Sequence, residues 1–433
     1  MNYVVIGSGA AGIAAVEGIR RIDPSGKIHL ISDEPEGYYS RPGLAYFLTG
    51  ELVERQLYPF TEADFQRLDV ERVGERVLRL HPESHKIELQ NGEAIPYNRL
   101  LVATGARAAT LNLPGSDALG VVKLDNILDA RIIIKIARKA RRAIVVGGGI
   151  TALEIVEGLV ARKVKVHYFL RGDRYWSNVL DETESRVVEN RLQEEGVKIH
   201  YHTELAEILT KRGRVAAVRT RDGHEIKSDM VAVAVGIRPH KELAADCGIQ
   251  TDRGIIVNER LQTSEPDIYA AGDVAQVYDP VSGSYVLDSL WGLARNQGTV
   301  AGLNMAGENH TYRKPVPFNV TRLANLTTTI IGTVGKGVDK DLVGIARGDS
   351  ETWRQLPEAI AAQSDFDVNR LRVLVGQHTL VGAVVMGDQT LSRPLQHLVA
   401  RKVDITAYRE GLLQPGAPIG DLVADMWTSC QKS

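Results

Sequence analysis

Two glycine-rich turns, each directly after a short β-branched run, constrain the fold of this chain more than any other feature. Residues 3–12 read Tyr-Val-Val-Ile-Gly-Ser-Gly-Ala-Ala-Gly, and residues 143–152 read Ala-Ile-Val-Val-Gly-Gly-Gly-Ile-Thr-Ala. A helix-like stretch and a second strand-like stretch follow each turn, at 13–22 and 27–32 and again at 153–162 and 164–170. This order is typical of a βαβ unit. The sequence therefore predicts an α/β protein with two Rossmann-like, three-layer nucleotide-binding domains.

Size and charge narrow the class of protein further. With 433 residues the chain exceeds what one hydrophobic core usually supports, so we expect two or three domains. Its 52 basic and 54 acidic residues exclude a generally basic nucleic-acid binder. No uncharged apolar stretch reaches the roughly 18 residues of a membrane span. The start lacks a basic, cleavable leader, and Cys247 and Cys430 are too few for a disulfide framework or a thiolate metal site. We therefore expect a reduced, cytoplasmic protein without a metal.

The first turn has the G-x-G-x-x-G spacing, with Gly7, Gly9 and Gly12 around Ala10 and Ala11. The first glycine permits the tight turn, the second lets the backbone approach a pyrophosphate, and the third lets helix and strand pack closely. Free N–H groups at the following helix terminus favour the phosphates. Asp33 and Glu34 end the next strand, where carboxylates accept hydrogen bonds from a ribose 2′-OH. The alternative is a structural turn beside a surface acid pair.

The second turn, at Gly147, Gly149 and Ile150, fits G-x-G-x-x-A. Where a ribose-binding acid would stand, after residues 164–170, the chain has Arg171 and Arg174. Arginines accommodate a 2′-phosphate, which favours NADPH over NADH. The alternative is that these arginines are solvated loop charges that pair with Asp173.

Further motifs lie at the ends of other predicted strands: Ala103-Thr104-Gly105, Gly236 and Ala271-Gly272-Asp273. With the two glycine turns in this order, the chain resembles the two-dinucleotide flavoprotein reductases of the pyridine nucleotide–disulfide oxidoreductase superfamily. The resemblance implies an FAD-binding domain at 1–112 and 250–318, interrupted by an NAD(P)H-binding domain at 113–249. Residues 319–433 then form a C-terminal α+β domain, which in relatives covers the flavin and often forms a dimer interface, so a homo-oligomer is consistent with it.

Residues 39–44, Tyr-Ser-Arg-Pro-Gly-Leu, are similar to the Y-x-R-P-x-L segment of rubredoxin and ferredoxin reductases, nitrite reductase flavin domains and apoptosis-inducing factor. That likeness implies roles for single residues, and a surface ion pair is the alternative for each charged one. Arg41 would contact FAD, Asp33 and Glu34 its adenosine ribose, and Asp273 its ribityl or pyrophosphate part. The Val77 and Ala103 backbones would lie near the adenine, Gln297 on a helix that starts beside the flavin, and Glu154 near the nicotinamide.

The chain departs from this superfamily in two ways. No cysteine precedes Cys247, so dithiol and sulfenate chemistry lack their nucleophile. Tyr46 stands where related reductases have a lysine near the flavin, and it donates only a neutral hydrogen bond. Tyr46 and Glu154 are therefore the candidate catalytic residues, in a flavin environment that differs from that of the relatives.

These observations predict an FAD-dependent NAD(P)H oxidoreductase that passes electrons to a rubredoxin- or ferredoxin-like carrier. One alternative is an oxidase that reduces oxygen or quinones, and another is a nucleotide-sensing flavoprotein with little turnover. Arg131, Lys135, Arg138 and Arg142 follow helical spacing, which predicts a basic helix face that steers an acidic carrier. A solvated helix exterior is the alternative.

Overall fold

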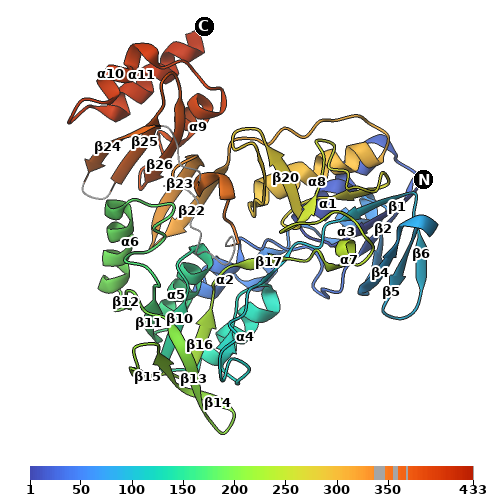
Figure 1. Cartoon of the computed structure of the whole chain (residues 1–433), viewed down its shortest axis with the longest axis horizontal. Helices are drawn as coiled ribbons and strands as arrows, with labels where there is room; N and C mark the ends of the chain where they lie inside the picture. Colours follow the sequence, from blue (N-terminus) through green and yellow to red (C-terminus); the bar gives the residue numbers. More distant parts are fainter. Residues whose placement is uncertain (336–346, 355–358, 367–368, 433) are drawn as a thin grey trace.

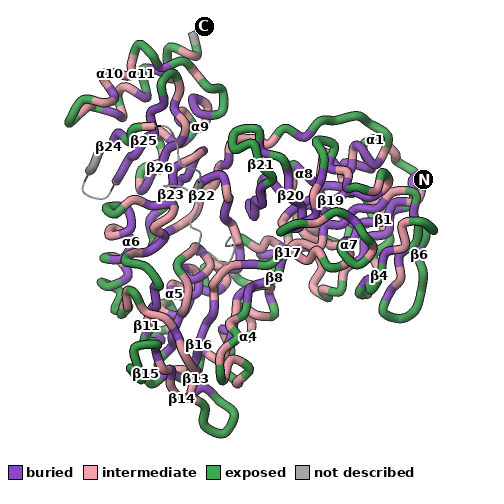
Figure 2. Tube along the Cα trace, in the orientation of Figure 1, coloured by how far each residue is buried: buried purple, intermediate pink, exposed green. Residues whose placement is uncertain are grey.

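A computed structural model describes residues 1–335, 347–354, 359–366 and 369–432. The chain forms two α/β units and a C-terminal unit that packs at one end of the second (Figure 1). Buried residues are concentrated in the strands and on the inner faces of the helices (Figure 2). No helix in the described part of the chain is long and apolar enough to cross a membrane.

The first unit is built on a parallel sheet in the order β19-β7-β1-β2-β3. Its strands are Ile268–Ala270 (β19), Arg99–Val102 (β7), Asn2–Ile6 (β1), Lys27–Ile31 (β2) and Glu71–Val73 (β3). Helices α1 (Ala10–Ile22) and α8 (Trp291–Met305) pack against each other beside it. Two small sheets complete the unit: β4 (Val77–His81), β5 (Lys86–Leu89) and β6 (Ala94–Pro96), and β18 (Ile255–Ile256), β20 (Ala275–Asp279) and β21 (Ser284–Val286).

The second unit repeats this plan with the parallel order β12-β11-β10-β16-β9. Its strands are Lys198–His200 (β12), Lys165–Phe169 (β11), Arg142–Val146 (β10), Met230–Val233 (β16) and Val121–Val122 (β9). Its helices are α4 (Ile127–Ala137), α5 (Ile150–Ala161) and α6 (Glu182–Glu194), and β13 (Leu205–Lys211), β14 (Arg214–Thr220) and β15 (Glu225–Lys227) form a side sheet. Because β19 returns to the sheet of β1, the second unit is inserted in the chain of the first.

Two short antiparallel strands, β8 (Ala106–Ala108) and β17 (Ile237–Pro239), pair where the chain leaves the first unit and returns to it. We propose that the domain boundaries lie near this connection, at 112/113 and 249/250, with the third at 318/319. The last of these coincides with β22, the first strand of the C-terminal sheet.

The C-terminal unit is an antiparallel sheet in the order β22-β23-β26-β25-β24. Its strands are Phe318–Leu323 (β22), Leu326–Gly332 (β23), Leu380–Met386 (β26), Asn369–Val375 (β25) and Ile360–Phe366 (β24), and its helices are Ser392–Ala400 (α9), Thr406–Leu412 (α10) and Ile419–Lys432 (α11). The helices gather on one side of the sheet (Figure 1). On the other side, buried Arg372 donates 2.8 and 2.9 Å hydrogen bonds to the buried carboxylate of Glu184 on α6. This ion pair joins the C-terminal sheet to the second unit.

The predicted basic helix face does not extend to Arg142. Helix α4 ends at Ala137, and Arg142 begins strand β10, paired with Lys165. Arg131 donates a 2.6 Å hydrogen bond to Glu36 and another of 2.6 Å to Glu54. The strand-forming run after Arg142 therefore overrides the helical spacing, and Arg131 joins α4 to the first unit instead of facing a partner.

Candidate functional site: a cleft between the two glycine turns

A cleft of about 1150 Å³ lies between the first unit, α5 of the second unit and two segments of the C-terminal unit. It opens at the carboxyl ends of β1 and β7, beside the point where the strand order of the first sheet reverses, which is where α/β sheets bind ligands. Most of the predicted site residues line it. They are Gly7, Gly9, Ala10, Ala11, Asp33, Glu34, Arg41, Tyr46, Val77, Ala103, Thr104, Gly105, Ile150, Glu154, Gly272 and Asp273.

The first glycine turn has the shape that an extended phosphate ligand needs. Gly7 has φ +109°, and a Cβ built on it would lie 2.2 Å from the Ala103 carbonyl oxygen. A Cβ on Gly12 would lie 1.9 Å from the Gly7 carbonyl oxygen, so both glycines are required by the fold itself. Gly9 differs: no described atom lies within 4 Å of its built Cβ, and it precedes α1 without a side-chain cap. Gly9 and the uncapped N–H groups of α1 are therefore available to a ligand.

Replacing Gly9 with alanine is expected to leave the fold intact and to weaken FAD binding. The new methyl group meets no protein atom, so we expect less than about 1 kcal/mol change in the free energy of unfolding of the apoprotein. It would occupy the space of the closest backbone approach to a pyrophosphate, and we expect at least about tenfold weaker FAD binding. Flavin fluorescence titration and urea unfolding measure the two quantities. Unchanged FAD affinity would contradict the role of this turn.

An ion pair connects the acid after β2 with the arginine of residues 39–44. Arg41 donates a 2.7 Å hydrogen bond to the Glu34 carboxylate and a 2.6 Å bond to the Asp125 carbonyl oxygen. Glu34 also accepts a 2.7 Å hydrogen bond from the Tyr39 hydroxyl. Burial disfavours the charge of Arg41, but Tyr39, Glu34, Asp125 and Asp273 raise its pKa above the usual value. Arg41 is therefore a fixed cation in the cleft.

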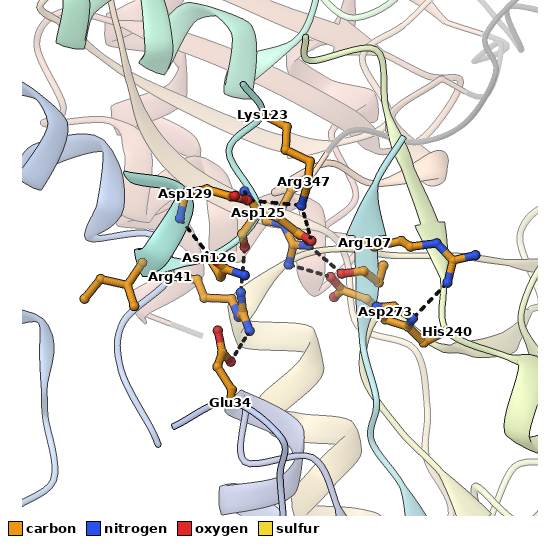
Figure 3. A network of polar contacts seen from close by, with 12 residues as sticks. Glu34, Arg41, Arg107, Lys123, Asp125, Asn126, Asp129, His240, Asp273 and Arg347 are labelled. Carbon is orange, nitrogen blue, oxygen red and sulfur yellow. Dashed lines mark hydrogen bonds and ion pairs between the residues drawn. The ribbon is translucent and has the colours of Figure 1, made fainter. Parts of the chain in front are cut away.

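The same network of polar contacts continues from Asp125 to Arg347 and Asp273 (Figure 3). Arg347 donates a 2.6 Å hydrogen bond to the Ala106 carbonyl oxygen, forms a hydrogen-bonded ion pair with Asp125, and lies 3.7 Å from an Asp273 carboxylate oxygen. Burial raises the pKa of Asp273, although the positive charges of Arg347 and Arg41 act to lower it. Burial opposes the charge of Asp125 as well, but Arg347, Lys123 and Arg41 lower its pKa.

The α5 side of the cleft is acidic. Glu154 and Glu157 lie one helical turn apart and both line the cleft. Burial, with the nearby Glu157 charge, raises the pKa of Glu154 to about 8, and burial raises that of Glu157 to about 7. Arg322 of β22 lies 4.9 Å from the centre of the Tyr46 ring and donates two 2.7 Å hydrogen bonds to Glu51. A cation from the C-terminal unit thus lies beside Tyr46.

Other predicted residues lie outside the lining of this cleft among the described residues. They are Gly12, Gly147, Gly149, Gly236, Gln297, Arg171 and Arg174. Gln297 is buried and accepts a 2.8 Å hydrogen bond from the Gly272 amide. This bond stabilises the turn that precedes Asp273. Arg174 donates hydrogen bonds of 3.0 and 3.2 Å to Asp173, as the alternative interpretation of this loop expects.

The comparison with protein families identifies the class of protein. The model of the pyridine nucleotide-disulphide oxidoreductase family matches residues 1–298. The chain belongs to this family. Membership makes it an FAD-dependent NAD(P)H oxidoreductase, and its cofactors are FAD and a nicotinamide nucleotide.

Several similar proteins are named as reductases. The 3-phenylpropionate/cinnamic acid dioxygenase ferredoxin–NAD(+) reductase component of Photorhabdus laumondii is 31% identical over 71% of this chain and 78% of its own length. The NAD(P)H nitrite reductase of Bacillus subtilis is 27% identical over 96% of this chain, which spans only 49% of that relative. The ferredoxin reductase for the CYP199A2 system from Rhodopseudomonas palustris has the same fold, with a TM-score of 0.86 at 22% identity over 98% of this chain and 99% of that one.

The cleft fits the cofactors of the family on its own geometry. Uncapped amides of α1 beside Gly9 and the cation Arg41 suit a pyrophosphate, and carboxylates at Asp33, Glu34 and Asp273 suit hydroxyl groups. No group of three or more potential metal ligands occurs among the described residues.

Four residues of the cleft were not predicted from the sequence: Asp125, Arg322, Arg347 and Glu157. Glu157 lies three residues after Glu154 on the same helix face, and this spacing in the sequence could have identified it.

Proposed function

We propose that this protein oxidises NADH or NADPH through FAD bound in the cleft and passes the electrons to a one-electron carrier protein. The observation that supports this most strongly is that one cleft is lined both by the first glycine turn and by Ile150 and Glu154 at the start of α5. Ligands bound at the two glycine turns would therefore meet in one space. Such proximity is what hydride transfer between two cofactors requires.

The residues of the cleft divide into groups with different tasks. The amides of α1 beside Gly9 hold the FAD pyrophosphate together with Arg41, and Asp33 and Glu34 bind the adenosine ribose. Asp273 binds the ribityl or pyrophosphate part, and Glu154 and Tyr46 border the nicotinamide. FAD, when bound, supplies the hydride-accepting chemistry, while the chain aligns the partners and sets the charge around them.

Protein sulfur has no part in this proposal. Cys247 is partly buried and its thiol contacts the Ala244 carbonyl oxygen at 3.3 Å, and Cys430 lies on α11. Neither belongs to the residues that line the cleft. Electrons would therefore leave directly from the flavin, as a one-electron carrier such as a ferredoxin or rubredoxin requires. The name of the Photorhabdus relative, a ferredoxin–NAD(+) reductase component, supports this acceptor class.

The choice between NADPH and NADH depends on the loop after β11. Arg171 and Arg174 favour NADPH because arginine binds a 2′-phosphate well. The pairing of Arg174 with Asp173 reduces this preference, and the relatives above are named for NAD(+) or for NAD(P)H. We propose that both nucleotides reduce the enzyme, with NADPH slightly favoured.

Anaerobic mixing of the FAD-loaded protein with NADPH or NADH is expected to bleach the flavin absorbance at about 450 nm. Stopped-flow spectroscopy with each nucleotide gives the rate and the preference, and FAD-free protein is the control. Addition of oxidised ferredoxin or rubredoxin should then restore the absorbance faster than oxygen or a quinone does. Absence of bleaching with both nucleotides would refute the proposed function. Fastest recovery with oxygen or a quinone would indicate an oxidase.

A further inference from the structure

Arg347 reaches the cofactor cleft from the C-terminal part of the chain, far in sequence from either glycine turn. Its guanidinium contacts Asp125 and the Ala106 carbonyl oxygen and lies 3.7 Å from Asp273. Figure 3 shows it between the two carboxylates. Its Nε atom is buried and has no hydrogen-bond partner in the described structure, so one charged donor in the cleft wall is left unused.

The segment after Arg347 is firmly anchored to the body of the protein. The Ser289 amide donates a 2.8 Å hydrogen bond to the Asp349 carbonyl oxygen, and the Leu287 amide donates a 2.9 Å bond to the Glu351 carboxylate. Trp353 is fully buried and packs edge-on against Trp176, with ring centres 6.1 Å apart. This anchoring holds the arginine at the cleft independently of the contacts that its own side chain makes.

Arg347 supplies one of the cations that balance the carboxylates at the centre of the cleft, and Lys123, 3.3 Å from Asp125, supplies another. Asp125 and Asp273 are two carboxylates, and Arg41 and Arg347 are the two cations that act on both of them. Arg41 is also shared with Glu34. Loss of Arg347 would therefore make the centre of the cleft more negative, among partly buried side chains whose charges interact more strongly than they would in bulk water.

We propose that Arg347 sets the reduction potential of the flavin bound in this cleft by stabilising the negative charge of its reduced form. This inference rests on the proposed function. A hydride, two electrons with one proton, leaves the nicotinamide ring, which becomes the cation of NAD(P)⁺. FAD bound in the cleft would accept this hydride and thereby gain one negative charge. A cation in the same cleft favours the reduced form through its charge, so a residue of the C-terminal unit would influence how readily the flavin accepts electrons.

Substitution of Arg347 tests this inference. In Arg347→Gln we expect reduced flavin to lose at least about tenfold in affinity relative to oxidised flavin, which corresponds to a two-electron midpoint potential lower by about 30 mV. Arg347→Lys keeps the charge and should restore most of the potential. Asp125→Asn removes a neighbouring negative charge and should shift the potential upward, so it decides the question if Arg347→Gln fails to fold or to retain FAD.

Arg253→Gln is the matched control because Arg253 pairs with Glu351 in the same segment, outside the cleft lining. It loosens the anchor without removing a charge from the cleft, and its potential should equal that of the wild type. Equilibrium titration with redox dyes gives all potentials without a nicotinamide nucleotide, so this test stands even if NADH and NADPH both fail to reduce the enzyme. An unchanged potential in both Arg347→Gln and Asp125→Asn, or an equal shift in Arg253→Gln, would overturn the inference.

Discussion

Replacing Gly298 with alanine is expected to destabilise the protein by about 3 kcal/mol or more, the largest effect on stability that we predict. Helix α8 crosses α1 at this glycine, and a Cβ built there would lie 2.1 Å from the Ala11 carbonyl oxygen. Gly302, one turn later, has the same relation to the Ala15 carbonyl oxygen at 2.2 Å. A methyl group at either glycine would clash with backbone atoms of α1, which cannot change rotamer. Only a shift of one helix relative to the other would remove the clash. Because α1 begins at the first glycine turn, that shift would also disturb the cofactor cleft.

Gly292→Ala is the matched control on the same helix. No described atom lies within 4 Å of a Cβ at Gly292, which is exposed near the start of α8. Alanine favours a helix over glycine, so this variant should be as stable as the wild type or more stable by up to about 1 kcal/mol. Urea unfolding of the two variants and the wild type gives the comparison. Equal stability of Gly298→Ala and Gly292→Ala would show that α1 and α8 are not packed this closely.

The parts of the fold that depend on local geometry could be predicted from the sequence. A turn that needs φ +109° at Gly7 and close contacts at Gly12 admits few residues other than glycine, so the motif identifies the βαβ unit. The second turn is equally diagnostic, since a Cβ on Gly147 would lie 2.1 Å from the Ala234 carbonyl oxygen. These two turns and the motifs at strand ends were enough to predict the family, and most of the residues predicted for the site line the cleft.

Contacts between distant segments could not be predicted. Nothing near Asp125 or Arg347 in the sequence marks them, because their partners are set by how the C-terminal unit packs on the cleft. The basic helix face does not reach Arg142 for the same reason. Helical spacing places Arg131 and Arg142 together, but tertiary pairing ends the helix at Ala137 and gives Arg131 to Glu36 and Glu54. Local patterns thus predict the elements of the site, and packing decides which charges meet there.

The difference in stability between Glu154→Gln and the wild type is expected to depend on pH. Burial raises the pKa of Glu154 to about 8. Between its usual pKa near 4.5 and about 8, the native state therefore binds more protons than the unfolded state. The stability that this carboxyl contributes is fully present below the lower value and is lost as the pH rises through the higher one. Glutamine does not titrate, so the variant should not share this loss.

The free energy of unfolding of Glu154→Gln relative to the wild type should therefore rise by about 2 kcal/mol from about pH 5.5 to about pH 9. We expect less than the full pKa shift implies because Glu154 lines an open cleft and keeps some contact with water. Glu51→Gln is the control: hydrogen bonds from Arg322 and Thr49 lower the Glu51 pKa to about 2, so its effect should be constant over this range. Urea unfolding at several pH values measures both. Parallel profiles for wild type and Glu154→Gln would mean that Glu154 is ionised at neutral pH.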